Sequence, residues 1–388
     1  MKNLMNFRFA FFAIVLLIIA CGLYIVLPRY SQTNKQERKD SVIKIGAIVF
    51  LTGNQSTLGS EVNNAFNIAM EDINKKGGLN GKKVQLIVED SKDLPKDGIM
   101  AFNKLVMDKI PIIITTGDVV SLSIAPIANK DSVILLTTIA AGSEITQNGE
   151  WVYRVWIQAE RQAKAIADYT FQNLKIKKSA ILFINNDYGI TSSNIFKRIF
   201  TQFGGTITGM DSYSIEQKDI KNQIIKLIQN KPEAIFVTGF GMGYANCIRQ
   251  LRSMNYKGLI VTDNTFSIPF FQEQTKSANE GIYFTSTLFD ENSMDSISYN
   301  FSKKYFENYN MKPSFVGAFA YDALNLAIHC IEQGEYNNIK MKYVLNNLNN
   351  YKGLIGNIKF NKTGEIDFPL VIKKMEKGIV RIVSDNAY

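Results

Sequence analysis

Residues 44–90 read KIGAIVFLTGNQSTLGSEVNNAFNIAMEDINKKGGLNGKKVQLIVED, and this run combines the patterns of strand, loop, helix and strand. The near-continuous apolar run from Ile43 to Leu51 is typical of a strand buried on both faces of a parallel sheet. Gly77-Gly78 is expected to end the following helix, and Asn80-Gly81 to turn the chain into the second strand. The apolar face of that helix consists of Val62, Ala65, Phe66, Ala69 and Ile73. This βαβ unit predicts an α/β fold with a right-handed crossover.

The loop TGNQSTLG, residues 52–59, follows the first strand of this unit. Open α/β sheets bind ligands beyond the carboxyl ends of their strands. We therefore expect this loop to form one wall of a ligand site.

Strands and helices keep alternating along the chain in two series, the second beginning near Ala159. Each series predicts its own doubly wound sheet, so we expect an α/β fold of two lobes. In the second series the expected strands are 179–185, 233–239, 258–263 and 281–287, and the expected helices are 160–174, 189–203, 217–229 and 243–254. The chain ends in an antiparallel hairpin that turns near Lys377-Gly378, which indicates that it crosses between the lobes more than once. We assign residues 42–158 and 289–355 to an N-terminal lobe, and residues 159–288 and 356–388 to a C-terminal lobe.

Composition excludes several classes of function. The hydrophobic content of 46% supports substantial cores. The formal net charge is +9, but the sequence contains no block of basic residues interleaved with exposed aromatic residues, so nucleic-acid binding is not expected. Cys247 and Cys330 lie in apolar helical patterns and are interpreted as buried thiols, with a bridge between them left open. The single histidine, His329, lies within a helical run, and neither a zinc site nor histidine-based catalysis is predicted.

The amino terminus predicts export. Residues 9–27 form an apolar stretch of the length that crosses a bilayer, preceded by Lys2 and Arg8. Three interpretations stay open: an uncleaved signal anchor, a lipoprotein signal that would lipidate Cys21, and a cleaved signal that releases a soluble product. Residues 28–41 are polar and charged and are interpreted as a tether. In each case we expect the globular part to work outside the cytoplasm, on the periplasmic side.

No catalytic or nucleotide-binding constellation is found. The loop GFGMGYA, residues 239–245, follows an expected strand, but its glycines have the spacing G-x-G-x-G and not that of a dinucleotide fingerprint. We therefore interpret it as a loop that lets a ligand or the other lobe approach closely. We predict that the protein has no cofactor and no metal site and that it is not an enzyme. The expected strand ends instead carry small polar and aromatic residues: Ser56, Thr57, Thr116 to Ser121, Thr138 to Gly142, Asn186 to Tyr188, Phe240, Asp263 and Phe289. Such groups favour a receptor for a small, even zwitterionic, molecule.

Several stretches of the chain resemble the extracytoplasmic solute-binding proteins of the leucine/isoleucine/valine-binding type, which serve ATP-driven (ABC) importers. The matching stretches lie within residues 43–370 and include IGAIVFLTG (45–53), AMEDINKKGGLNGKKVQLIVEDSKD (69–93), TGDVVS (116–121), NNDYG (185–189), IRQLRSMNYKG (248–258) and AYDA (320–323). The resemblance implies a type I periplasmic-binding-protein fold, in which about three hinge crossings join two lobes that close on a solute. It also implies membrane permease subunits as partners.

The resemblance assigns roles to single residues. Ser121 matches a serine whose hydroxyl holds the ligand carboxylate, and Ala140 matches a position that offers backbone groups to the same carboxylate. Tyr188 matches an aromatic residue that covers the ligand, and Asp263 matches an acidic partner of the ligand α-amine. Local structure offers a second explanation of three of these: Ser121 is a good helix cap, Tyr188 suits a turn, and Asp263 suits a cap or local ion pair. Phe289 is included as a strand-end aromatic residue.

Three positions depart from the family pattern. Ala141 replaces the usual threonine and loses a hydroxyl, Phe240 replaces a tyrosine found in some members, and Leu58 replaces an aromatic residue. An amino acid, an amide, an aromatic acid or another small carboxylate therefore stays open as the ligand. We expect delivery of a solute to a permease; the alternative is a membrane-anchored sensor of the same fold that signals through a partner, and an enzyme is the third hypothesis.

Overall fold

The computed structural model describes residues 42–53, 55–142, 144–290, 295–384 and 388. The predictions for the amino terminus, with its apolar stretch, its tether and Cys21, lie outside these residues. The chain divides into two compact units: the smaller contains Met70–Gln85 with the residues up to Lys44, and the larger contains Ile45–Ala69 and Leu86–Tyr388.

The smaller unit holds the predicted glycine turn. Gly77 and Gly78 both have positive φ and follow the end of the helix, and Asn80-Gly81 also has positive φ at both residues. The Asn74 side chain donates to the Val84 carbonyl and accepts from the Val84 N–H, each at 2.9 Å. The helix stop and the turn predicted from the sequence are thus confirmed.

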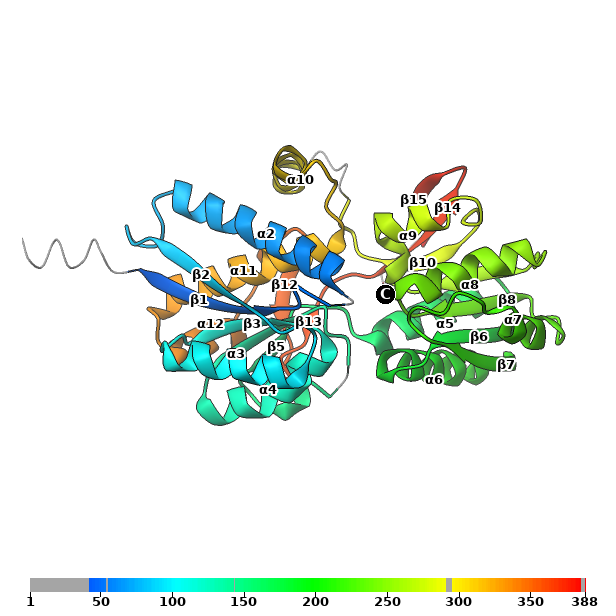
Figure 1. Ribbon diagram of the computed structural model, residues 1–388, viewed down its shortest axis with the longest axis horizontal. Helices are drawn as coiled ribbons and strands as arrows, with labels where there is room; N and C mark the ends of the chain where they lie inside the picture. Colours follow the sequence, from blue (N-terminus) through cyan, green and yellow to red (C-terminus); the bar gives the residue numbers. More distant parts are fainter. Residues whose placement is uncertain (1–41, 54, 143, 291–294, 385–387) are drawn as a thin grey trace, which may run out of the picture. The chain divides into compact units, whose positions relative to one another are not determined.

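A five-stranded sheet with strand order β2-β1-β3-β4-β5 contains the first series (Figure 1). Its strands are β1 (Ile43–Val49), β2 (Val84–Asp90), β3 (Ile112–Thr116), β4 (Ile134–Thr138) and β5 (Val152–Arg154). β3 pairs in parallel with both β1 and β4, and β4 pairs in parallel with β5. Every residue of β3 and β4 is buried, as expected for central parallel strands.

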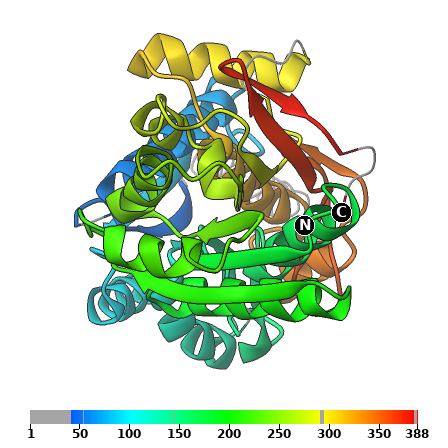
Figure 2. The same ribbon diagram turned by 90° about the vertical axis from the view of Figure 1, so that its right-hand side faces the viewer.

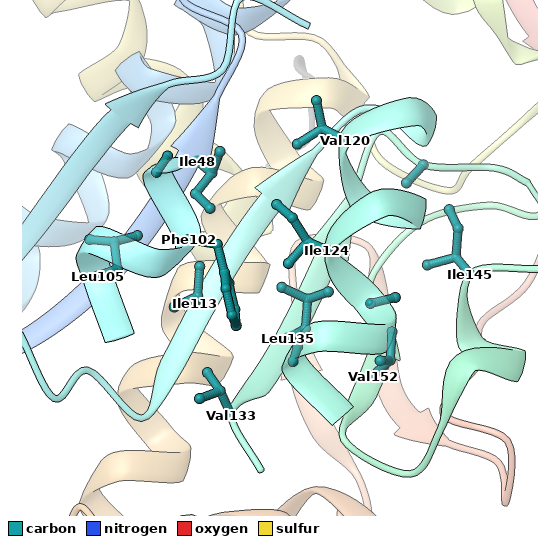
Figure 3. Close-up of a cluster of buried hydrophobic side chains, with 14 of the residues drawn as sticks. Ile48, Phe102, Leu105, Ile113, Val120, Ile124, Val133, Leu135, Ile145 and Val152 are labelled. Atoms are coloured by element: carbon teal, nitrogen blue, oxygen red, sulfur yellow. The ribbon is translucent and has the colours of Figure 1, made fainter. Parts of the chain in front are cut away.

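Helices cover this sheet. They are α2 (Ser56–Lys75), α3 (Pro95–Met107), α4 (Asp118–Asp131), α11 (Phe315–Gly334) and α12 (Asn338–Asn346). Phe102 of α3 and Ile124 of α4 point towards Ile113 and Leu135 of the strands, and all four are fully buried (Figure 3). Each such side chain stabilises the fold by about 1.5–3 kcal/mol. This core holds the loops after β3 and β4 in place.

A seven-stranded sheet with order β15-β14-β10-β9-β8-β6-β7 contains the second series. Its strands are β6 (Lys178–Ile184), β7 (Thr206–Tyr213), β8 (Ala234–Thr238), β9 (Leu259–Thr262), β10 (Tyr283–Ser286), β14 (Val371–Glu376) and β15 (Ile379–Ile382). β6 to β10 pair in parallel, whereas β14 runs antiparallel to β10 and to β15. The predicted antiparallel ending is confirmed and forms the red hairpin in Figure 2.

The helices of this sheet follow the predicted alternation. They are α5 (Ala159–Gln172), α6 (Asp187–Gln202), α7 (Lys221–Ile228), α8 (Gly241–Ser253) and α9 (Pro269–Gln274), with the short 3-10 turn η2 (Asn264–Ser267). The prediction of a helix from residue 217 was wrong, because the Gln217 side chain bonds locally. It accepts from the Ser214 N–H at 3.0 Å and donates to the Asp219 carbonyl at 2.9 Å. Such local bonds compete with a helical backbone.

The chain passes from one sheet to the other after β5, after β10 and after a small sheet of order β11-β12-β13. That small sheet comprises β11 (Tyr351–Gly353), β12 (Gly356–Phe360) and β13 (Ile366–Asp367), and α10 (Ser296–Tyr309) precedes α11. The expected lobe boundary between residues 355 and 356 falls between β11 and β12, which are paired. Cys247 and Cys330 are buried and free, as predicted.

The helix that follows the first strand of each sheet series, α2 after β1 and α6 after β6, approaches that strand through a glycine. A Cβ added to Gly59 in α2 would lie 2.0 Å from the Phe50 carbonyl oxygen, and one added to Gly189 in α6 would lie 2.0 Å from that of Ile184. Only glycine permits so close a helix–strand contact. The strand-end loops of both series are therefore drawn tightly onto their helices.

Candidate functional site

A cavity of about 670 Å³ lies in the larger unit, at the carboxyl ends of the parallel strands. Four of the predicted ligand residues line it, namely Leu58, Ala141, Tyr188 and Phe240. Its size suits a small organic molecule. The predicted wall after β1 is present in part, since Gln55 of the same loop also lines the cavity.

Aromatic rings form much of the cavity wall. Trp156 stacks on Phe315 with a centroid separation of 5.5 Å, and the rings of Tyr188 and Phe240 lie 6.1 Å apart. Phe271 adds a further ring. Flat apolar walls of this kind enclose the hydrocarbon part of a ligand, and they also attract a cation placed over their faces.

Asp263 does not line the cavity; it is fully buried behind it. One carboxylate oxygen accepts from the Thr238 hydroxyl at 2.7 Å, from the Tyr188 hydroxyl at 3.0 Å and from the Gly239 N–H at 3.1 Å. The other oxygen accepts from the Thr265 N–H at 3.0 Å. Burial raises the pKa of Asp263, and these hydrogen bonds oppose the shift. The geometry makes Asp263 the group that orients Tyr188.

The glycine loop 239–245 packs against the same part of the site, and its Gly239 N–H is one of the donors to Asp263. A Cβ on Gly239 would lie 2.2 Å from the Tyr213 hydroxyl, and one on Gly241 would lie 2.4 Å from Ile215. The close approach that these glycines permit is therefore made by neighbouring parts of the protein. Phe240 between them is half-buried and lines the cavity.

Three further predicted residues lie away from the cavity wall. Ser121 is fully buried in α4, where its hydroxyl lies 2.9 Å from that of Thr115. Ala140 is fully buried beneath the loop, and Phe289 packs near Phe301 with a centroid separation of 6.3 Å. Among the described residues that line the cavity, none of these three is present.

The loop from Ala140 to Gly142 is held from behind by Arg154. This fully buried guanidinium donates to the Ala140 carbonyl at 3.0 Å and also to the Gly142 carbonyl. Its Nε lies 3.0 Å from a carboxylate oxygen of Glu365, and the other oxygen of Glu365 accepts from Thr146. Because the carbonyls point towards a buried cation, the N–H groups of the loop are left for the cavity side.

The carboxylate of Asp118 faces these N–H groups and accepts a hydrogen bond from this loop. Gly142 N–H donates to Asp118 Oδ1 at 2.7 Å, and the neighbouring Ala141 N–H interacts favourably with the same carboxylate. Burial raises the pKa of Asp118, while these hydrogen bonds and the nearby charge of Arg154 oppose the shift. A side-chain carboxylate thus sits on backbone donors of the residues that follow Ala140, the position whose backbone groups the resemblance assigns to a ligand carboxylate.

Asp93 lies beside Asp118 on the cavity wall. Its Oδ2 accepts from Gln55 Nε2 at 2.6 Å, whereas its Oδ1 is buried and has no hydrogen-bond partner among the described residues. A Cβ added to Gly117 would lie 2.8 Å from that Oδ1, so only glycine fits here, and its φ of +87° is a second reason. Burial raises the pKa of Asp93.

On the side of the second sheet, Asn264 lines the cavity although it is only 4% exposed. Its backbone N–H donates to Gln162 Oε1 at 3.1 Å, and its side-chain Nδ2 has no partner among the described residues. A buried amide donor without a partner is costly, so Asn264 is a wall residue with an unmet hydrogen-bonding requirement.

The sequence reasoning missed Asp93, Asp118, Trp156 and Asn264 as wall residues. Asp118 was within the range of strand-end residues considered, but Ser121 was chosen from it. For Asp118 the available signal was only an acidic residue in the first turn of a helix, where the helix dipole favours a carboxylate. No signal in the sequence singled out Trp156. Among the described residues no cluster suited to hold a metal ion is present.

The comparisons with known proteins fit this architecture. The profile of the family described as periplasmic binding protein matches residues 42–378. The chain is 31% identical to a Leu/Ile/Val-binding protein homolog of Brucella melitensis over 56% of this chain and 60% of that protein. It is 29% identical to a Leu/Ile/Val-binding protein of Rhizobium johnstonii, over 66% of this chain and 70% of that protein. The crystal structure of a leucine binding protein from Thermotoga maritima has a TM-score of 0.80 and 26% identity, covering 88% of this chain and 98% of the other.

Proposed function

The chain belongs to the periplasmic binding protein family, whose members here are solute-binding proteins and not enzymes, and we propose that it binds a small solute outside the cytoplasm and delivers it to an ABC-type permease. The observation that carries this proposal is the cavity of about 670 Å³, with aromatic walls and a few convergent polar groups. Such a composition suits recognition of a small molecule. None of the helices among the described residues is both long and apolar enough to cross a membrane.

A thermal-unfolding screen of the full chain tests the binding part of the proposal. The panel contains amino acids, amides, small carboxylates and small amines of matched carbon skeletons. A ligand at about one hundred times its Kd stabilises the folded state by about 2.7 kcal/mol, which is a readily measured shift in Tm. If no compound of the panel shifts the Tm, solute binding is refuted.

Two variants connect binding to the cavity. Phe240→Ala should weaken the ligand found in the screen roughly tenfold or more, because a covering ring is lost. Phe306→Ala is the matched control, since Phe306 is 51% exposed in α10 and does not line the cavity. Equal affinity of both variants and the unaltered chain would place the binding site elsewhere.

Transport and sensing are separated in cells. Deletion of the chromosomal copy should abolish high-affinity uptake of the labelled ligand, and an intact copy on a plasmid should restore it. Unchanged uptake together with loss of a ligand-dependent transcriptional response would favour the sensor instead.

A further inference from the structure

The cavity wall has one sign of charge. Its ionisable residues are carboxylic acids, namely Asp93, Asp118, Glu144 and Asp187. No lysine, arginine or histidine is present among the described residues that line it. Clefts lined by one sign of charge concentrate ligands of the opposite sign and repel ligands of the same sign.

The backbone donors that would receive an anion are already used. The Gly142 N–H donates to the carboxylate of Asp118 at 2.7 Å, and the neighbouring Ala141 N–H interacts with the same carboxylate. The carbonyls on the other side of this loop face Arg154. A ligand carboxylate would have to displace Asp118 from these donors, and it would then lie beside one or two carboxylates in a partly dehydrated cavity.

Asp93 has a carboxylate oxygen that lacks a hydrogen-bond donor among the described residues. This oxygen, Oδ1, is buried at the cavity wall, whereas Oδ2 is bonded to Gln55. A Cβ added to Gly117, the residue directly before Asp118, would lie 2.8 Å from Asp93 Oδ1, so the two acids adjoin on the cavity wall. Such a pair is matched by a cationic group with several N–H donors, such as an ammonium.

Two features define the remainder of the ligand. The stacked rings of Trp156 and Phe315 provide an apolar wall that also attracts a cation. Asn264, a wall residue only 4% exposed, has a buried amide nitrogen without a partner among the described residues, and a ligand oxygen that draws this amide into the cavity would satisfy it. This second group is independent of Asp93 and Asp118 and begins the turn η2, which follows β9 of the seven-stranded sheet.

Building on the proposed solute-binding function, we propose that the solute is a small organic amine, bound as its ammonium form by Asp93 and Asp118 and requiring no carboxylate of its own. Its body is apolar, and it carries a hydroxyl, ether or carbonyl oxygen towards Asn264. This assignment differs from the sequence-based expectation, in which Asp263 was the partner of an amine.

Matched ligand sets test this assignment by calorimetry on the full chain. Each set contains one carbon skeleton as zwitterion, amine and acid: leucine, 3-methylbutylamine and 4-methylpentanoate, then phenylalanine, 2-phenylethylamine and 3-phenylpropanoate. Sets of amino alcohols and the corresponding hydroxy acids extend the series with an oxygen for Asn264. We expect the amine to bind at least tenfold more tightly than the acid of the same skeleton.

Each outcome has one meaning. An acid that binds more tightly than its amine, or a zwitterion that binds while its amine does not, overturns the cationic assignment and leaves solute binding intact. Absence of binding by all amines, acids and zwitterions overturns the assignment together with the proposed function.

Variants locate the ammonium. Asp93→Asn and Asp118→Asn should each weaken amine binding at least tenfold while preserving shape. Asp131→Asn, at the far end of the same helix as Asp118 and exposed, is the matched control and should bind like the unaltered chain. Folding is checked by circular dichroism and Tm, and if one variant fails to fold the other still decides. Amine affinities within twofold of the unaltered chain in a folded variant would overturn the assignment.

Discussion

Replacing Asp118 with alanine should convert the cavity from one that disfavours carboxylates into one that accepts them. The substitution removes a negative charge from the wall, releases the Gly142 N–H that donates to that carboxylate, and frees the neighbouring Ala141 N–H from its interaction with it. Arg154 still holds the carbonyl side of the loop, so the released donors keep their direction.

The magnitude follows from two contributions. A hydrogen bond to a charged acceptor is worth about 1.5–3 kcal/mol net, so the released Gly142 donor offers roughly that much to a ligand carboxylate before ordering costs. Removal of a like charge at roughly 6 Å adds about 3 kcal/mol at an effective dielectric constant near 20. Even if ordering the ligand offsets half of this sum, acids should bind about one hundredfold more tightly than to the unaltered chain.

Asp118→Asn is the matched comparison that separates the two contributions. Its amide oxygen can still accept from Gly142, so it removes the charge but releases fewer donors. Calorimetric titration of both variants with 4-methylpentanoate and 3-phenylpropanoate should therefore rank the affinity as alanine, asparagine, then aspartate. A folded alanine variant with no gain in acid affinity would refute the assignment of these N–H groups as potential anion donors.

Three stability predictions follow from buried charges, each measured by urea unfolding. Arg154→Ala should cost about 3–5 kcal/mol, because Glu365 would remain as a buried charge without its cation; a cost below 1 kcal/mol would contradict this. Glu61→Ala should cost about 2 kcal/mol, because the N–H and hydroxyl of Ser314, each 2.7 Å from Glu61 Oε1, would lose their acceptor at the start of α11. Burial raises the pKa of Asp322 to about 7, so the folded state holds its proton where the unfolded state has lost it, and stability falls by a few kcal/mol between about pH 4 and 7. Asp322→Asn should flatten this part of the pH profile, and an unchanged profile would exclude the contribution.

The spacing of apolar residues along the sequence predicted most of the fold. The buried strands β3 and β4 and the apolar face of α2 follow directly from the spacing of their residues. The small sheet β11-β12-β13 was not predicted as a sheet, because two- to five-residue strands leave too short a pattern. Residues 217–220 were predicted as helix because the bonds of a single polar side chain, that of Gln217, leave no periodic signal.

The site was predicted less completely, for a geometric reason. The sequence places a residue at a strand end but does not show which way its side chain points. In α4, Asp118, Val119 and Leu122 line the cavity, whereas Ser121 on the same helix is buried against Thr115 of β3. One step along a helix rotates a side chain by about 100°, so the position in the loop alone cannot separate the two.

The loop from Ala140 to Gly142 joins these conclusions. Arg154 fixes its carbonyls from behind, so its N–H groups present the same donor pair whatever faces them from the cavity. If the facing position carries no acid, these donors are available to an anionic ligand; with Asp118 there, the donors are satisfied and a negative charge is presented instead. One side chain at the start of α4 therefore reverses the charge that the wall offers while the backbone remains the same. We expect ligand charge in proteins of this architecture to follow the residue at this position more closely than the residues of the loop itself.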